Sequence, residues 1–99
     1  MKSLTGAQRK YLRGRAHSLS PVIQVGKQGV TPDLVKAMNE ALDSHELIKV
    51  KFVDFKEERK ELSREIAERT SSEAVGLIGN VAILYRQQPD EQKRKILLP

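Results

Sequence analysis

The chain has no cysteine and no tryptophan, and only 4% of its 99 residues are aromatic. The absence of cysteine excludes disulfides, thiolate metal sites and thiol nucleophiles. The scarcity of aromatic side chains argues against a surface on which many successive bases stack. No apolar run approaches the roughly 20 residues of a membrane-spanning helix, and the N-terminal residues lack the apolar core of a signal peptide. From the absence of these signals we expect a cytoplasmic protein.

Acidic residues are missing from the first third of the chain. Residues 1–30 contain six basic residues and no Asp or Glu, whereas the remaining residues contain 12 basic and 13 acidic ones. The whole net charge of +5 therefore comes from residues 1–30. An unopposed basic segment is the electrostatic mark of a protein that binds a polyanion.

The length and the apolar pattern predict one domain with alternating elements. At 99 residues the chain is expected to form a single domain, residues 1–99, because a second core would not fit. Apolar periodicity predicts the element order α-β-α-β-α-β-β. The predicted helices span 6–17, 32–44 and 56–70, and the predicted strands span 21–25, 47–53, 74–78 and 81–85.

The connections between these elements limit their arrangement. Strands separated by a helix should run parallel, and the Gly79-Asn80 pair predicts a tight antiparallel hairpin. We therefore expect an α/β (α+β) two-layer sandwich, with a four-stranded mixed sheet and helices packed on it. The polar segment 87–99 is expected to be a mobile tail, in which Ile96-Leu97-Leu98 could add an edge strand.

A glycine-bounded loop is the most informative motif. Gly26-Lys27-Gln28-Gly29 follows a predicted strand and precedes a helix that starts at Thr31-Pro32. The glycines let the backbone approach a ligand closely, and the helix start presents N–H groups and partial positive charge. This arrangement suits a phosphate. A nucleotide-binding P-loop is excluded, because it needs an earlier glycine and a Ser or Thr after the lysine.

Basic side chains on two other predicted elements are further candidates for contact with phosphates. Arg9, Lys10 and Arg13 lie on one face of the first predicted helix, with Arg15 nearby. Lys49 and Lys51 alternate with apolar residues on a predicted strand, so they should lie on its solvent-exposed face. The alternative for each of these residues is an ordinary solvated surface.

Catalytic and metal-binding constellations are not visible in the sequence. His17 and His45 are the only histidines, and neither has a partner at ligand spacing. The carboxylates mostly lie on predicted helices beside Lys or Arg, without an isolated pair suited to general acid–base catalysis. We expect no catalytic residue, no metal and no cofactor. Tyr11 and Tyr85 are expected to be half-buried core residues.

Four segments of the chain resemble the CRM domain (chloroplast RNA splicing and ribosome maturation) in its single-domain bacterial YhbY-type form. The block from His45 to Lys51 is the most distinctive of the matching residues. The resemblance extends from about Leu4 to Arg86 and rests on Ala16-His17, Pro21 to Thr31, Ala41 to Lys51 and Leu84-Tyr85-Arg86.

This resemblance implies a fold like the C-terminal domain of translation initiation factor 3 and a GxxG loop used as in KH domains. It also implies a non-enzymatic, monomeric RNA-binding protein that associates with ribosomal RNA and precursors of the large (50S) subunit. Three alternatives stay open: an adaptor that docks on ribosome-associated proteins, a small hydrolase or nuclease, and a protein that binds a membrane surface.

Overall fold

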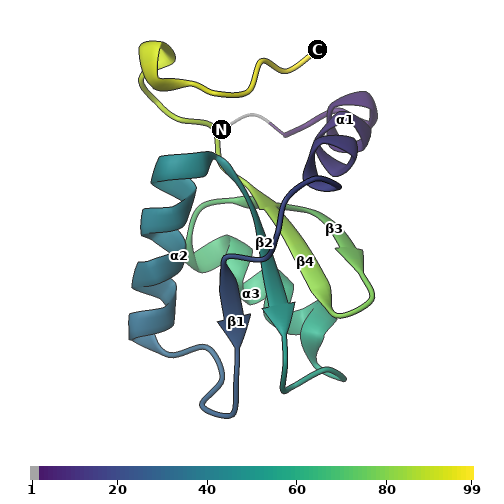
Figure 1. Cartoon of the computed structure of the whole chain (residues 1–99), viewed down its shortest axis with the longest axis vertical. Coiled ribbons are helices and arrows are strands. Elements are labelled where there is room, and N and C mark those ends of the chain that lie inside the picture. The colour runs from purple at the N-terminus through teal and green to yellow at the C-terminus, as the bar shows by residue number, and fades with distance from the viewer. Residues whose placement is uncertain (1–2) are drawn as a thin grey trace.

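The computed structural model describes residues 3–99, and its elements follow one another in the predicted order (Figure 1). Within these residues there are three α-helices, four strands and one short 3-10 turn. Their bounds are α1 Gly6–Ala16, β1 Ile23–Val25, α2 Pro32–His45, β2 Leu47–Phe52, α3 Arg59–Arg69, β3 Glu73–Ile78, β4 Val81–Tyr85 and η1 Glu91–Lys93.

The four strands form one mixed sheet in the order β1-β2-β4-β3. β1 runs parallel to β2, and β4 runs antiparallel to both of its neighbours, β2 and β3. The predicted mixed sheet is therefore confirmed. Gly79, with φ of 58°, lies in the predicted two-residue turn between β3 and β4. This left-handed conformation favours glycine, because glycine has no Cβ to clash with the backbone.

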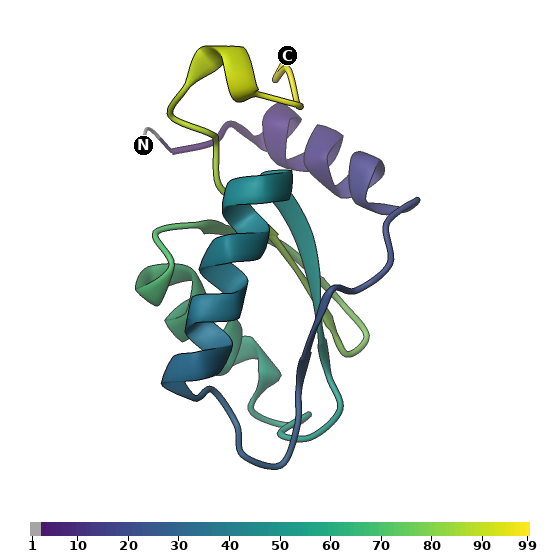
Figure 2. The same ribbon diagram turned by 60° about the vertical axis from the view of Figure 1, so that its left-hand side comes forward.

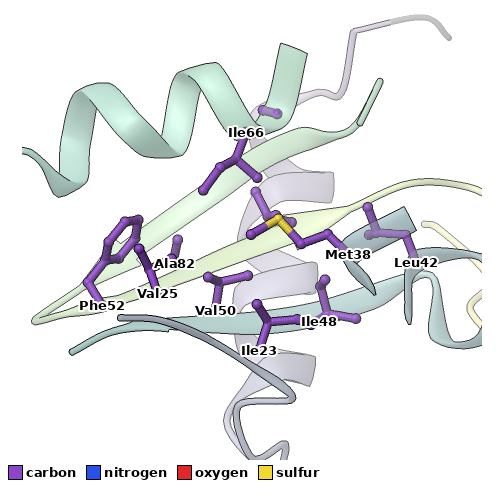
Figure 3. Packing of buried hydrophobic residues seen from close by; sticks show 11 residues of the cluster. Ile23, Val25, Met38, Leu42, Ile48, Val50, Phe52, Ile66 and Ala82 are labelled. Atoms are coloured by element: carbon purple, nitrogen blue, oxygen red, sulfur yellow. The ribbon is translucent and has the colours of Figure 1, made fainter. Parts of the chain in front are cut away.

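The main core lies between one face of the sheet and the helices α2 and α3 (Figure 3). Met38 and Leu42 lie one turn apart on α2, so both side chains reach the same face of the sheet. Ile66 contributes from α3. The strand residues facing them alternate with residues on the opposite face and include Ile23, Val25, Ile48, Val50, Phe52, Ala82 and Leu84.

Beyond the predicted sheet and the helices α2 and α3, the opposite face of the sheet is partly covered by α1. Leu12 and Ala16 of α1 pack against Ile83 and Tyr85 of β4. β4 is an unbroken apolar run because both of its faces are buried where α1 crosses it. The sheet thus has a third, partial layer, and Figure 2 shows α1 at the end of the molecule away from the β1–α2 loop.

The C-terminal segment packs beside α1 and forms no strand within the described residues, so the predicted edge strand is wrong. Ile96 is buried in the same cluster as Leu12. The segment is held by Glu46, a fully buried residue whose carboxylate accepts hydrogen bonds from the backbone N–H groups of Gln88, Lys95 and Ile96. These three bonds tie the C-terminal segment to the residue that directly follows α2. The carboxylate satisfies the N–H of Ile96, the first residue of the predicted edge strand.

Burial raises the pKa of the Tyr85 hydroxyl, and the negative charge of Glu46 raises it further, while Arg94 acts in the opposite direction. Tyr85 is fully buried rather than half-buried as predicted, whereas Tyr11 is half-buried. The difference arises because α1 and Ile96 together close the cluster over the end of β4.

The third helix begins at Arg59, three residues later than predicted. Phe55 has φ of 57°, and the residues after it form a turn in which the N–H of Glu58 donates to the Phe55 carbonyl at 3.1 Å. Glu58 precedes the helix without a side-chain capping bond. The charged pattern alone could not show this turn, because the residues before Arg59 have good helix propensity.

Candidate nucleic-acid interface

The GxxG loop, Gly26–Gly29, is a tight turn that joins β1 to α2. The backbone N–H of Gly29 donates to the carbonyl of Gly26 at 3.0 Å, which places Lys27 and Gln28 at the corners of the turn. Both corner side chains are exposed. Gly29 has φ of 72°, so its left-handed conformation favours glycine, whereas Gly26 does not share this requirement.

The corner residues leave hydrogen-bond donors free. Within residues 3–99, the backbone N–H groups of Lys27 and Gln28 donate no hydrogen bond to another protein group. A hollow of about 270 Å³ adjoins the loop and is also lined by Gln24, Thr31 and Leu34. Two free amides and an ammonium group around a small hollow can receive the oxygens of one phosphate.

The N-terminus of α2 offers less to a phosphate than the sequence predicts. The Thr31 hydroxyl accepts the N–H of Leu34 at 3.1 Å, and the Thr31 carbonyl accepts the N–H of Val35. Pro32 has no N–H, and Asp33 adds a carboxylate to the first turn. Because the helix is already capped and carries an acid, the donors for a phosphate come mainly from the loop.

Phe55 is a residue at this site that sequence reasoning missed. Its segment is tied to β1, because the N–H groups of Val53 and Asp54 both donate to the Val25 carbonyl. A Cβ on Gly29 would lie 3.4 Å from the Phe55 ring. The side chain is 41% exposed. An isolated aromatic residue in a charged segment, outside any apolar periodicity, was the signal that could have found it.

The two strand lysines have different surroundings. Lys51 is exposed and pairs in register with Gln24 of β1, which lines the hollow at the loop. Lys49 donates from Nζ to the Leu19 carbonyl at 3.0 Å, so it fastens the linker between α1 and β1. Lys51 therefore joins the candidate interface, while Lys49 has a structural partner.

Two arginines of α1 are engaged with the edge strand β3. Arg9 forms a 2.8 Å ion pair with Glu73 and also donates to the Ala74 carbonyl. Arg13 donates to the Val75 carbonyl at 3.0 Å, and its aliphatic stem lies over Gly76. They cover backbone groups of an edge strand that could otherwise pair with another chain.

The other basic residues of α1 face outward. Lys10 is exposed, and Arg15 is exposed with its guanidinium 2.9 Å from the Tyr11 hydroxyl and 5.8 Å from the ring centroid. In Figures 1 and 2, α1 lies at the opposite end of the molecule from the GxxG loop. The structure does not bring the helix residues and the loop into one compact site.

Changing both Arg9 and Arg13 to Gln should lower the free energy of unfolding by about 1–2 kcal/mol, because bonds to partly exposed charged groups are lost from the edge of the sheet. Lys10→Gln, on the same helix without such partners, should change it by less than about 0.5 kcal/mol. Urea unfolding of the three proteins measures both effects. Equal stability of the double variant and the parent would show that the arginines do not hold α1 to β3.

Comparison with known proteins gives a consistent result. The model of the CRS1 / YhbY (CRM) domain family matches residues 4–86. The chain is 37% identical to the Bacillus subtilis protein named Probable RNA-binding protein YqeI, over 97% of this chain and 99% of that protein. It is 39% identical to a Haemophilus influenzae protein named RNA-binding protein, over 100% of this chain and 98% of that protein.

A solved structure is also similar. The solution structure of the hypothetical protein SAV1595 from Staphylococcus aureus has a TM-score of 0.82 and 37% sequence identity, covering 98% of this chain and 100% of that one. Among the helices of residues 3–99, none has the length and apolar character needed to cross a membrane. The same residues contain no cluster of three or more His, Asp or Glu side chains that could hold a metal ion.

Proposed function

The chain belongs to the CRS1 / YhbY (CRM) domain family, and we propose that it binds ribosomal RNA and assists assembly of the large (50S) ribosomal subunit. The observation that carries the proposal is the GxxG loop, with its free amides and exposed Lys27, in a chain whose net charge comes from its first third. The relatives named as RNA-binding proteins support the choice of RNA as the polyanion.

The loop would bind the RNA backbone rather than read its sequence. The N–H groups of Lys27 and Gln28 would donate to a phosphate oxygen, and the Lys27 ammonium would add a point charge. The exposed Lys51 would neutralise a neighbouring phosphate, and the exposed Phe55 ring would stack on a base. Binding of this kind should depend strongly on salt and only modestly on sequence.

The proposal also covers the oligomeric state and the location of the protein. It would act as a monomer in the cytoplasm, where ribosomal precursors assemble. Support for ribosomal RNA comes from the family resemblance and from the basic first third of the chain, while the loop geometry supports only contact with a nucleic-acid backbone.

Co-sedimentation with ribosomal precursors tests this proposal. The protein should migrate with precursors of the large subunit in a sucrose gradient of cell lysate. It should be released by ribonuclease and by raising the salt concentration, because counterions compete with the phosphate contacts. Migration that survives ribonuclease would contradict RNA binding and support an adaptor that docks on a ribosome-associated protein. Absence from the precursor fractions would contradict the role in large-subunit assembly.

A further inference from the structure

A second hollow lies at the opposite end of β1 from the GxxG loop. It has a volume of about 430 Å³, within the range of pockets that hold small ligands. Its walls come from the end of α1, the linker before β1, the C-terminal end of α2, the start of β2 and the tail. We refer to it as the linker pocket.

The floor of the linker pocket is apolar and partly open to solvent. Leu47, Ile48 and Ile96 are buried beneath it. Leu19 and Val22, also in its lining, are 38% and 51% exposed. Scattered exposed apolar residues are ordinary, but here two of them join buried ones in a single concave surface. Such a surface can receive a flat apolar group.

The rim of the linker pocket is basic. Arg15 and Lys95 line it, and within the described residues no Asp or Glu side chain does. Ser20 and His45 also line it, and their side chains form no hydrogen bond with another described residue. The pocket therefore combines an apolar floor, free polar groups and cationic charge that is not offset at the rim.

The linker pocket and the GxxG loop lie at the two ends of the same strand. Val22 precedes Gly26 by four residues, a span of about 13 Å in extended chain. The pocket wall formed by the tail is held in place by Glu46, which accepts the N–H groups of Lys95 and Ile96. One short single strand of nucleic acid could therefore contact both sites.

We propose that the linker pocket holds an unpaired nucleobase of the same RNA strand whose backbone the GxxG loop binds; this inference rests on the proposed function. The apolar floor matches the flat face of a base, and Ser20 and His45 can hydrogen-bond its edge. Arg15 and Lys95 at the rim match the phosphates on either side of that base. An acidic peptide would also match the positive charge of the rim. Comparing oligonucleotides with and without bases distinguishes such a peptide from a nucleobase.

The test compares two oligonucleotides and three proteins. The oligonucleotides are an oligouridylate of about eight nucleotides and an abasic oligonucleotide with the same sugar–phosphate backbone. The proteins are the parent, the double variant Leu19→Ala with Val22→Ala, and a matched control, Val53→Ala with Ile78→Ala. The control removes two other exposed apolar side chains, which are 45% and 56% exposed and lie outside the pocket lining.

The ratio of the two dissociation constants is the readout. The parent and the control should bind the oligouridylate more tightly than the abasic strand. The pocket variant should lose about tenfold in affinity for the oligouridylate and keep its affinity for the abasic strand, because only apolar contact with the base is removed.

A pocket variant that keeps the parental ratio would overturn the nucleobase site while leaving the phosphate-binding loop intact. Equal binding of both oligonucleotides by the parent would also overturn it and leave the pocket to a partner of another class, such as an acidic peptide. If the parent bound neither oligonucleotide, the proposed function itself would fail and the pocket proposal would fail with it.

Discussion

Replacing Lys27 and Gln28 together by Asp should weaken RNA binding about 30-fold or more at roughly 0.1 M salt. The change alters the loop by three charge units beside the bound phosphate, and each unit contributes on the order of 1 kcal/mol in a solvated site. Both side chains are exposed, so the free energy of unfolding should change by less than about 0.5 kcal/mol. Titration of a ribosomal RNA fragment at several salt concentrations measures affinity and salt slope together.

The tail supplies a matched control for this charge change. Gln92 and Lys93 are adjacent, exposed and at the other end of the molecule from the loop, so replacing both by Asp produces the same net charge. Because the solvated tail is separated from the loop by more than the Debye length of about 10 Å, the control should lose only about threefold in affinity. Equal losses in the two variants would show that overall charge, rather than the loop, determines binding.

Glu46→Ala should lower the free energy of unfolding by about 3–5 kcal/mol. The buried carboxylate accepts three backbone N–H groups, and its loss would leave these donors without their partner. The tail should then leave the cluster that contains Ile96, and trypsin should cleave faster after Lys93 and Lys95. Urea unfolding and timed proteolysis measure the two effects.

Two further variants distinguish the effect of losing the Glu46 carboxylate from the effect of backbone strain and from the loss of any tail carboxylate. Glu46 has φ of 64°, so Glu46→Gly should be about 1 kcal/mol less destabilising than Glu46→Ala, because glycine adopts this conformation freely. Glu91→Ala removes an exposed tail carboxylate and should have an effect below about 0.5 kcal/mol. If Glu46→Ala behaved like Glu91→Ala, the buried carboxylate would not be what holds the tail.

Local sequence signals predicted most of the fold. The Thr31-Pro32 start of α2, the alternation in β2 and the Gly79-Asn80 turn each depend on neighbouring residues, and the structure confirms all three. The late start of α3 follows instead from the turn that begins at Phe55, a residue whose ring lies beside Gly29 of the GxxG loop. Such a contact links segments far apart in the chain, so periodicity could not reveal it.

The candidate site was predicted less completely, for the same physical reason. The sequence identifies the GxxG loop because its glycines are adjacent to the strand and helix that position it. Arg9 and Arg13 looked equivalent to Lys10 as basic residues, yet their bonds to β3 depend on how α1 crosses the sheet. Their contact with RNA stays a prediction. The position of Phe55 beside the loop, and the linker pocket, both depend on contacts between segments far apart in the chain.

Crosslinking the protein to RNA in cells, followed by mapping of the crosslinked residues and nucleotides, shows whether the GxxG loop contacts ribosomal RNA. We expect crosslinks from residues 26–29 and Phe55 to ribosomal RNA of the large subunit. Crosslinks confined to the outer face of α3, at residues such as Lys60 and Arg64, or the absence of any crosslink at residues 26–29, would contradict this expectation.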